Sequence, residues 1–181
     1  MIIALNTKLK LNKNMKKLLF AFLLLFSVHF SFAQDQEAIA YNDKIVTEQT
    51  KIAESILSFS NNPNEFGLSQ IQKQAEESLN TIKSMKPYKG EKNFLNCAKN
   101  LFKFYIDITK NEYKQMLSLI TESSKYPEKE LVDKVQKLTN SLTKKEKPLD
   151  EKFQAAQVAF AEKFNFKLTK NALQEELGSD E

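Results

Sequence analysis

The sequence is poor in the residue types that most catalytic and metal centres need. Its 181 residues include no Arg, no Trp, one His, one Cys and three isolated Gly. The single His, His29, lies in a predicted export signal, so the exported chain has no imidazole. These absences exclude Ser-His-Asp and Cys-His catalysis, Cys/His zinc sites, ferritin-type di-iron sites, bidentate Arg recognition and Gly-rich phosphate loops. We predict that the protein is not an enzyme and has no cofactor and no metal site.

The positive charge of the chain is confined to its first residues. The formal net charge is +4, from 27 lysines against 23 acids. Five lysines precede residue 18 and no acid precedes Asp35, which leaves 22 lysines against 23 acids in the rest. A nucleic-acid surface needs a dense face of one sign and usually Arg. We therefore expect no nucleic-acid partner.

Residues 15–33 have the pattern of a cleaved signal peptide. Lys16 and Lys17 precede an apolar run, and small residues occupy the −3 and −1 positions before a cleavage site between Ala33 and Gln34. The alternative is an uncleaved anchor, but the run is shorter than the roughly 20 apolar residues of a spanning helix. We predict a bacterial protein exported to the periplasm, the cell surface or the medium, with no stable membrane anchor after cleavage. Residues 1–14 are an upstream extension and a possible misassigned start.

The remaining chain shows helical periodicity and no sustained strand pattern. Residues 34–172 are predicted to form one all-α domain, an elongated antiparallel up-down bundle of four long helices, and 173–181 a frayed tail. The expected helices begin near Asp35, at a capping box starting with Ser69, near Glu91 and at Pro127. The third, running to Ser124, is the most apolar and should be the best buried.

Pro148 interrupts the apolar stripe of the last predicted helix. The stripe keeps its phase across this residue, which favours a kink over a break that would start a fifth helix. The Phe-rich segment that follows is interpreted as core-facing, with membrane or partner contact as the alternative. Cys97 has apolar neighbours and is interpreted as an inert thiol rather than a reactive one.

Two amide side chains interrupt the apolar stripe of the first predicted helix. Asn42 and Gln49 are seven residues apart and lie between isoleucines. With Asp43 they are the candidate binding residues, as the polar end of a site for a small ligand or a partner. The alternative is a layer that sets the register of the bundle, the best-attested use of such amides.

The segment after the predicted signal carries a resemblance. Glu37 to Ile52 reads Glu-Ala-Ile-Ala-Tyr-Asn-Asp-Lys-Ile-Val-Thr-Glu-Gln-Thr-Lys-Ile. It resembles the opening helix of uncharacterised bacterial secreted and surface proteins, in which Tyr-Asn-Asp precedes an amphipathic helix containing Gln. The resemblance implies an envelope or secreted location and carries no activity. Many of those proteins look like lipoproteins, whereas this chain has no Cys near the predicted cleavage site.

Two functional hypotheses follow from the sequence. The first is a non-catalytic protein-interaction module of the cell envelope, whose partner is an unknown envelope protein. The second is a carrier for a small apolar or amphipathic ligand held between the helices, with Asn42 and Gln49 as its polar contacts. The oligomeric state does not follow from the sequence.

Overall fold

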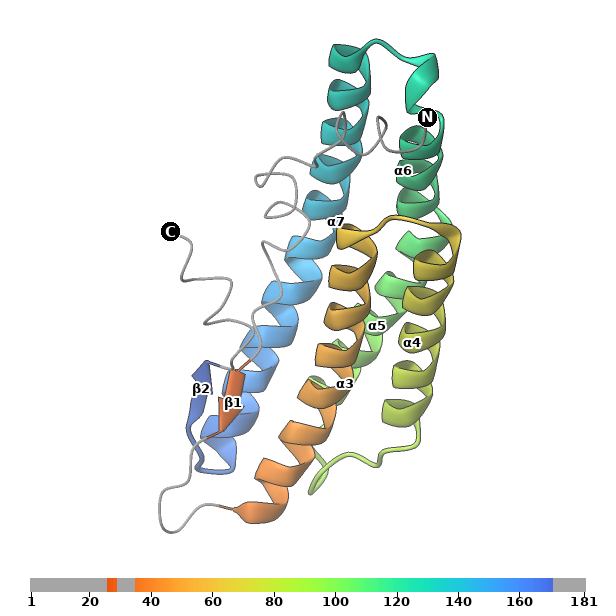
Figure 1. Cartoon of the computed structure of the whole chain (residues 1–181). Coiled ribbons are helices and arrows are strands. Elements are labelled where there is room, and N and C mark those ends of the chain that lie inside the picture. The colour runs from red at the N-terminus through yellow and green to blue at the C-terminus, as the bar shows by residue number, and fades with distance from the viewer. Residues whose placement is uncertain (1–25, 29–34, 171–181) are drawn as a thin grey trace.

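The computed structural model describes residues 26–28 and 35–170, which form an all-α helical bundle with one short pair of strands (Figure 1). No helix in this part is long and apolar enough to cross a membrane. The elements in chain order are β1 (Phe26–Val28), α3 (Gln36–Asn61), α4 (Glu65–Lys83), α5 (Asn93–Lys110), α6 (Glu112–Thr121), a 3₁₀ turn (Ser123–Lys125), α7 (Glu128–Lys163) and β2 (Leu168–Lys170).

The first predicted helix is confirmed as α3. The Asp35 side chain caps its N-terminus by accepting a hydrogen bond from the backbone N–H of Ala38 (3.2 Å). Ala38, Ile45 and Ile52 follow one another at seven-residue intervals and are fully buried. This spacing keeps one apolar stripe facing the rest of the bundle.

The second helix starts four residues before the predicted capping box. Asn64, not Ser69, is the N-cap of α4, and its Oδ1 accepts from the backbone N–H of Gly67 (2.8 Å). Ser69 already lies inside the helix and donates its hydroxyl to the carbonyl of Phe66 (2.7 Å). The box was wrong because Asn64 directly follows Pro63 and is an equally good cap at an earlier position.

The third predicted helix, from Glu91 to Ser124, is two helices. At Asn111 the backbone leaves the helical region (φ −115°, ψ −86°), so α5 ends at Lys110 and α6 begins at Glu112. The Asn111 side chain donates to the carbonyl of Asp107 (2.9 Å) and so satisfies an acceptor at the end of α5. Because α6 has only 10 residues, the expectation of four long helices is not confirmed for this part of the chain.

The last helix, α7, runs through Pro148 without a break and contains 36 residues. The alternative in which Pro148 starts a fifth helix is therefore wrong. Proline lacks a backbone N–H, so its presence inside α7 leaves the helix one intrahelical hydrogen bond short.

The core lies where α5 packs between α4 and α7 (Figure 1). The burial of Phe94 and Phe102 confirms the expectation that this segment is well buried. Phe153, Phe160 and Phe166 are buried too, which confirms the core-facing interpretation of these rings. Their contacts include Phe94 with Phe153 (centroids 5.3 Å apart) and with Phe160 (5.4 Å).

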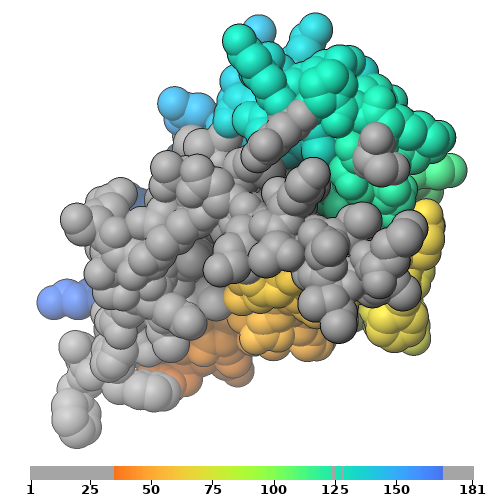
Figure 2. All heavy atoms as spheres, turned by 45° about the horizontal axis from the view of Figure 1, so that its top comes forward, coloured from red at the N-terminus to blue at the C-terminus, as the bar shows by residue number. Residues whose placement is uncertain are grey.

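The helices do not all end at the same level at one end of the bundle. In Figure 1 the α6–α7 end extends beyond the loop that joins α3 to α4. Figure 2 shows the teal surface of α6 and α7 and the yellow surface of the α3–α4 corner on the same face.

The two strands pair antiparallel, with Phe26 opposite Lys170 and Val28 opposite Leu168. Strand β1 falls within the predicted signal peptide, so cleavage before Gln34 would remove it from the exported protein. The cleavage site between Ala33 and Gln34, the extension 1–14 and the tail 173–181 lie outside the described residues.

Candidate functional site

The structure brings two of the three predicted binding residues together and adds a third that the sequence did not single out. Asn42 is fully buried, and its Oδ1 accepts a hydrogen bond from Nε2 of Gln157 on α7 (2.9 Å). Its Nδ2 donates to Oδ1 of the exposed Asp43 (3.1 Å). We call Asn42, Asp43 and Gln157 the amide layer. It joins α3 to α7 by a direct bond between buried amides, as expected of a register-setting layer.

The signal that could have identified Gln157 is its place on the apolar stripe of the last helix. It lies four residues after Phe153 and three before Phe160, both fully buried. On a helix, residues at these spacings share a face. Gln157 therefore occupies a core position, like Asn42 on α3.

Gln49 does not join the amide layer. Its side chain is fully buried, and among the residues that the structure describes neither its Nε2 nor its Oε1 has a hydrogen-bond partner. Two helical turns, about 10 Å, separate it from Asn42 along α3. A buried amide without partners costs about 1–3 kcal/mol unless a water or a ligand satisfies it. Of the predicted site residues, Gln49 is therefore the one whose side-chain amide could still form hydrogen bonds with a ligand.

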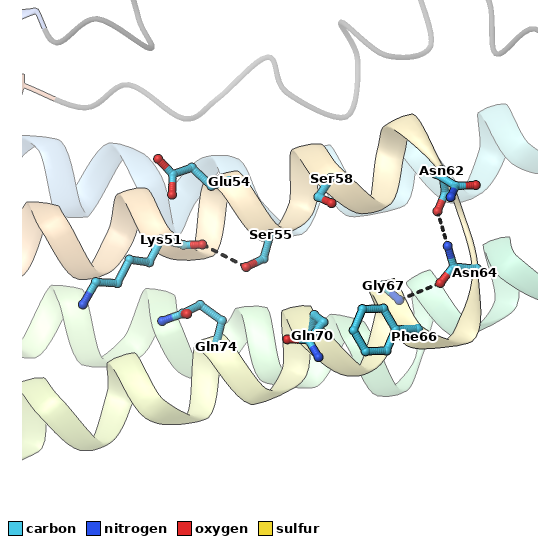
Figure 3. A pocket seen from close by; sticks show the side chains of 10 residues that line it. All are labelled: Lys51, Glu54, Ser55, Ser58, Asn62, Asn64, Phe66, Gly67, Gln70 and Gln74. Carbon is cyan, nitrogen blue, oxygen red and sulfur yellow. Dashed lines mark hydrogen bonds between the residues drawn. The ribbon is translucent and has the colours of Figure 1, made fainter.

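An open pocket of about 540 Å³ lies between α3 and α4, and the sequence did not predict it. Figure 3 shows Ser55 and Ser58 on α3 across from Gln70 and Gln74 on α4, with the ring of Phe66 at the first turn of α4. We call it the α3–α4 pocket. The lining residues are Lys51, Glu54, Ser55, Ser58, Asn62, Asn64, Phe66, Gly67, Gln70 and Gln74.

Hydrogen bonds between the Asn64 side chain and the backbone fix the loop end of the α3–α4 pocket. Asn64 caps α4 and also donates its Nδ2 to the carbonyl of Asn62 (2.7 Å). Gly67 lies close to the buried ring of Phe59, where a Cβ would approach Cδ2 to 3.3 Å. The missing side chain thus lets the first turn of α4 pack directly on α3.

A hydrogen-bonded chain fixes the other end of the pocket. The hydroxyl of the buried Ser78 donates to Oε2 of Glu48 (2.8 Å) and accepts from Nε2 of Gln74 (3.0 Å). Oε1 of Glu48 pairs with Nζ of Lys51 (2.7 Å). Gln74 and Lys51, which line the pocket, are thus held by a polar contact that joins α3 to α4.

The sequence contains one weak indication of the pocket, at the turn between the first two helices. The run Asn61-Asn62-Pro63-Asn64 is typical of a helix end, and Phe66 lies next to it outside the predicted second helix. A large aromatic beside a polar turn and outside any apolar stripe has no core position to fill. Phe66 is in fact 72% exposed.

A second polar region lies on α7 where it faces α5. Glu146 and Asp150 are four residues apart, and burial raises the pKa of each to about 7. The negative charge of Glu146 raises the pKa of Asp150 further. Tyr105 donates its hydroxyl to Oε1 of Glu146 (3.0 Å), and Gln154 donates to Oδ2 of Asp150 (2.5 Å). Within the described part of the chain, Oδ1 of Asp150 has no hydrogen-bond partner. We call Glu146, Asp150 and Tyr105 the carboxyl layer.

The carboxyl layer has the perturbed acids of an acid–base centre but lies away from the α3–α4 pocket. Neither Glu146 nor Asp150 is among the pocket-lining residues, whose one carboxylate is Glu54. Acid–base chemistry needs the proton-transferring group within hydrogen-bond reach of its substrate. The two regions therefore do not combine into a catalytic arrangement.

Polar contacts also join the start of α3 to the loop before α5. The carboxylate of Asp35 accepts from the Tyr88 hydroxyl (2.8 Å) and from Nζ of Lys89 (2.7 Å). The two bonds lower the pKa of Asp35 to about 2, and the bond with Lys89 has the larger effect. The Tyr88 ring packs edge-on against Phe164 (5.0 Å between centroids), so this loop aromatic belongs to the bundle.

Cys97 is half-buried, and its thiol lies 3.7 Å from Oδ1 of Asn93. Burial, followed by the negative charge of Glu91, raises the pKa of the thiol. A raised pKa lowers the thiolate fraction and with it the reactivity. This direction favours the inert interpretation of Cys97.

In the part of the chain that the structure describes, no group of three or more His, Cys, Asp or Glu residues is arranged to hold a metal ion. No protein-family model, curated protein or solved structure matches the chain.

Proposed function

We propose that the chain is a non-catalytic, exported helical-bundle protein that acts as a protein-interaction module of the cell envelope. The signal pattern of residues 15–33 supports its export. We also propose that its helices form an up-down bundle. The proposed docking surface is the α3–α4 pocket with Phe66 at its edge.

The exposure of Phe66 carries this proposal. The large hydrophobic side chains exposed among the described residues are Phe66 (72%), Val132 (47%) and Val158 (41%). Phe66 is the largest of the three and lies at the pocket, whereas the two valines lie on α7. Aromatic side chains, Phe included, are enriched at protein interfaces relative to the rest of the surface, so an exposed ring beside a pocket with a polar lining supports a docking role.

Photo-crosslinking in cells tests the proposal. A photoreactive phenylalanine analogue replaces Phe66 in one variant and Val132 in a matched control, and the attached peptides are identified by mass spectrometry. We expect Phe66 to label one envelope protein reproducibly and Val132 to label it weakly or not at all. Equal or diffuse labelling from both positions would show that the pocket is not the docking surface.

Gln49 supports a second candidate function, a carrier for a small amphipathic ligand. Its fully buried amide has two unused hydrogen-bonding atoms, which a ligand between the helices would satisfy. Organic extraction of the purified protein followed by mass spectrometry should then yield one molecule at near-stoichiometric amount. The variant Gln49→Leu should lose it, and empty extracts from both proteins would exclude the carrier.

A further inference from the structure

We propose that the α3–α4 pocket binds an extended, uncharged polypeptide segment of about five residues, with an apolar side chain of that segment seated on Phe66. This inference rests on the proposed function and specifies the kind of partner that the pocket takes.

The spacing of the lining residues matches an extended chain. On α3 the lining includes Lys51, Ser55, Ser58 and Asn62, and on α4 it includes Phe66, Gln70 and Gln74. Four-residue steps along a helix advance about 6 Å, and two residues of a β-strand advance about 6.6–6.8 Å. An extended segment lying along the pocket thus meets a polar group from each helix at about every second residue.

The lining chemistry suits peptide groups. Asn and Gln side chains donate and accept hydrogen bonds, and so do Ser hydroxyls. A bound segment presents one N–H donor and one C=O acceptor per residue, and both need partners when they leave water. The lining supplies two Asn, two Gln and two Ser from three parts of the chain. Ser55 already donates to the carbonyl of Lys51 (3.0 Å), the Asn64 amide is bonded to the backbone at both its oxygen and its nitrogen, and Gln74 donates to Ser78 (3.0 Å). The proposed partners of the peptide units are therefore Ser58, Asn62 and Gln70.

The charges of the lining favour an uncharged segment. Among the described lining residues, Lys51 and Glu54 are the charged ones, and their charges cancel. Lys51 already pairs with Glu48 at 2.7 Å, which leaves less of its charge for a ligand. A strongly acidic or basic segment would find no complementary cluster here.

The length of the pocket sets the length of the segment. From Lys51 to Asn62 the α3 side spans eleven residue steps, about 16 Å. An extended chain rises about 3.3 Å per residue, so about five residues fit. At the loop end the exposed ring of Phe66 offers apolar surface without a hydrogen-bonding group of its own. This favours an aliphatic or aromatic side chain at that end of the segment.

A random heptapeptide display library, selected on the exported protein purified from its cells, tests this inference. We expect enrichment of peptides that lack charged residues and carry at least one apolar side chain. One enriched peptide is then synthesised and titrated by calorimetry into the parent protein and four variants. The variants are Phe66→Ala and Gln70→Ala in the pocket, and the controls Val132→Ala and Gln72→Ala outside it.

The expected pattern is specific to the pocket. Phe66→Ala should weaken binding roughly tenfold or more, as loss of an aromatic anchor does. Gln70→Ala should weaken it about threefold to tenfold, as loss of a hydrogen bond does. Gln72 lies on the same helix but is not among the pocket-lining residues, so its variant should bind like the parent. NMR of the complex should show shifts of the Gln70 and Gln74 side-chain amides and an extended peptide backbone.

Three results would overturn the inference. The first is no enrichment above background, the second is enrichment of charged peptides, and the third is a peptide whose affinity is the same in Phe66→Ala as in the parent. A parallel titration with uncharged oligosaccharides of N-acetylglucosamine adds a fourth, because saturable binding that Phe66→Ala abolishes would assign the pocket to a glycan. If Phe66 still crosslinks one envelope protein while no peptide is selected, the module docks on a folded surface. In that case the inference fails and the proposed function stands.

Discussion

The amide layer and the carboxyl layer share the helix α7, on which Gln157 lies seven residues after Asp150. They satisfy their buried polar groups in opposite ways. In the amide layer, Gln157 and Asn42 form a direct bond that is neutral at every pH. In the carboxyl layer, Glu146 and Asp150 are acids whose burial favours the protonated form up to about pH 7. The amide layer therefore holds α7 against α3 at every pH, whereas the stability of the contact between α7 and α5 depends on the protonation of Glu146 and Asp150.

The largest effect expected from this difference is the pH dependence of stability. The ordinary pKa values of 4.5 for Glu146 and 3.8 for Asp150 apply in the unfolded chain, and both rise to about 7 in the folded protein. Between these values the folded state binds more protons, so the free energy of unfolding falls as the pH rises, by at most about 1.4 kcal/mol per pH unit for each acid. Urea unfolding should show a loss on the order of 4 kcal/mol from pH 4.5 to pH 7.5.

The variant Glu146→Gln/Asp150→Asn isolates this contribution. It should flatten the profile between pH 4.5 and pH 7.5 and be more stable than the parent at pH 8. A matched control is Glu162→Gln, an exposed acid near the end of the same helix. If the control flattens the profile as much as the double variant does, the pH dependence does not arise in the carboxyl layer.

The next effect comes from breaking the amide layer. Gln157→Ala removes the donor to Asn42 Oδ1, leaves that buried acceptor unsatisfied and creates a small cavity beside it. Together these should lower the free energy of unfolding by about 3 kcal/mol. The loss should be the same at pH 5 and pH 8, because no member of this buried pair titrates. A double-mutant cycle with Asn42→Ala should give a coupling of about 1–2 kcal/mol, and additive losses would contradict a direct bond.

The two layers also show which parts of the structure a single sequence can predict. Periodicity located α3 and α7, because a stripe of buried residues leaves a regular trace in the sequence. It missed the break at Asn111, where a single residue leaves the helical region while the apolar stripe continues on both sides. It found Asn42 because an amide among isoleucines is conspicuous, but not its partner Gln157, which comes 115 residues later.

The carboxyl layer and the α3–α4 pocket were harder to predict for different reasons. Glu146 lies in the run Lys144-Lys145-Glu146-Lys147, whose Lys-rich composition is typical of a solvated helix end. Only the packing of α7 on α5 shows that its carboxyl reaches Tyr105. The pocket depends on how two helices diverge from one loop, and no local pattern records that geometry.

Gln49→Leu sharpens the contrast between the two amides of α3. Asn42 is paired and Gln49 is not, although both are fully buried and seven residues apart. Replacing an unpaired buried amide with an apolar side chain of similar size should raise the free energy of unfolding by about 1–2 kcal/mol. Asn42→Leu should lower it instead. A destabilised Gln49→Leu protein would show that a water or ligand already satisfies this amide.

The smallest expected effect comes from Tyr105→Phe, which removes one hydroxyl from the carboxyl layer and leaves the packing of the ring intact. The bond that Tyr105 donates lowers the pKa of Glu146, so its loss should move that pKa further above 7. The variant should lose about 1 kcal/mol of stability, and more at pH 8 than at pH 5, because a hydrogen bond to an ionised carboxylate is the stronger one. NMR titration of the Glu146 carboxyl carbon measures the pKa directly.

Tyr113→Phe is the matched control, since Tyr113 is also buried near Glu146 and no hydrogen bond joins the two in the described structure. If both variants move the pKa of Glu146 equally, the hydroxyl of Tyr105 does not hold the charged form, and burial alone sets the proton affinity of this layer.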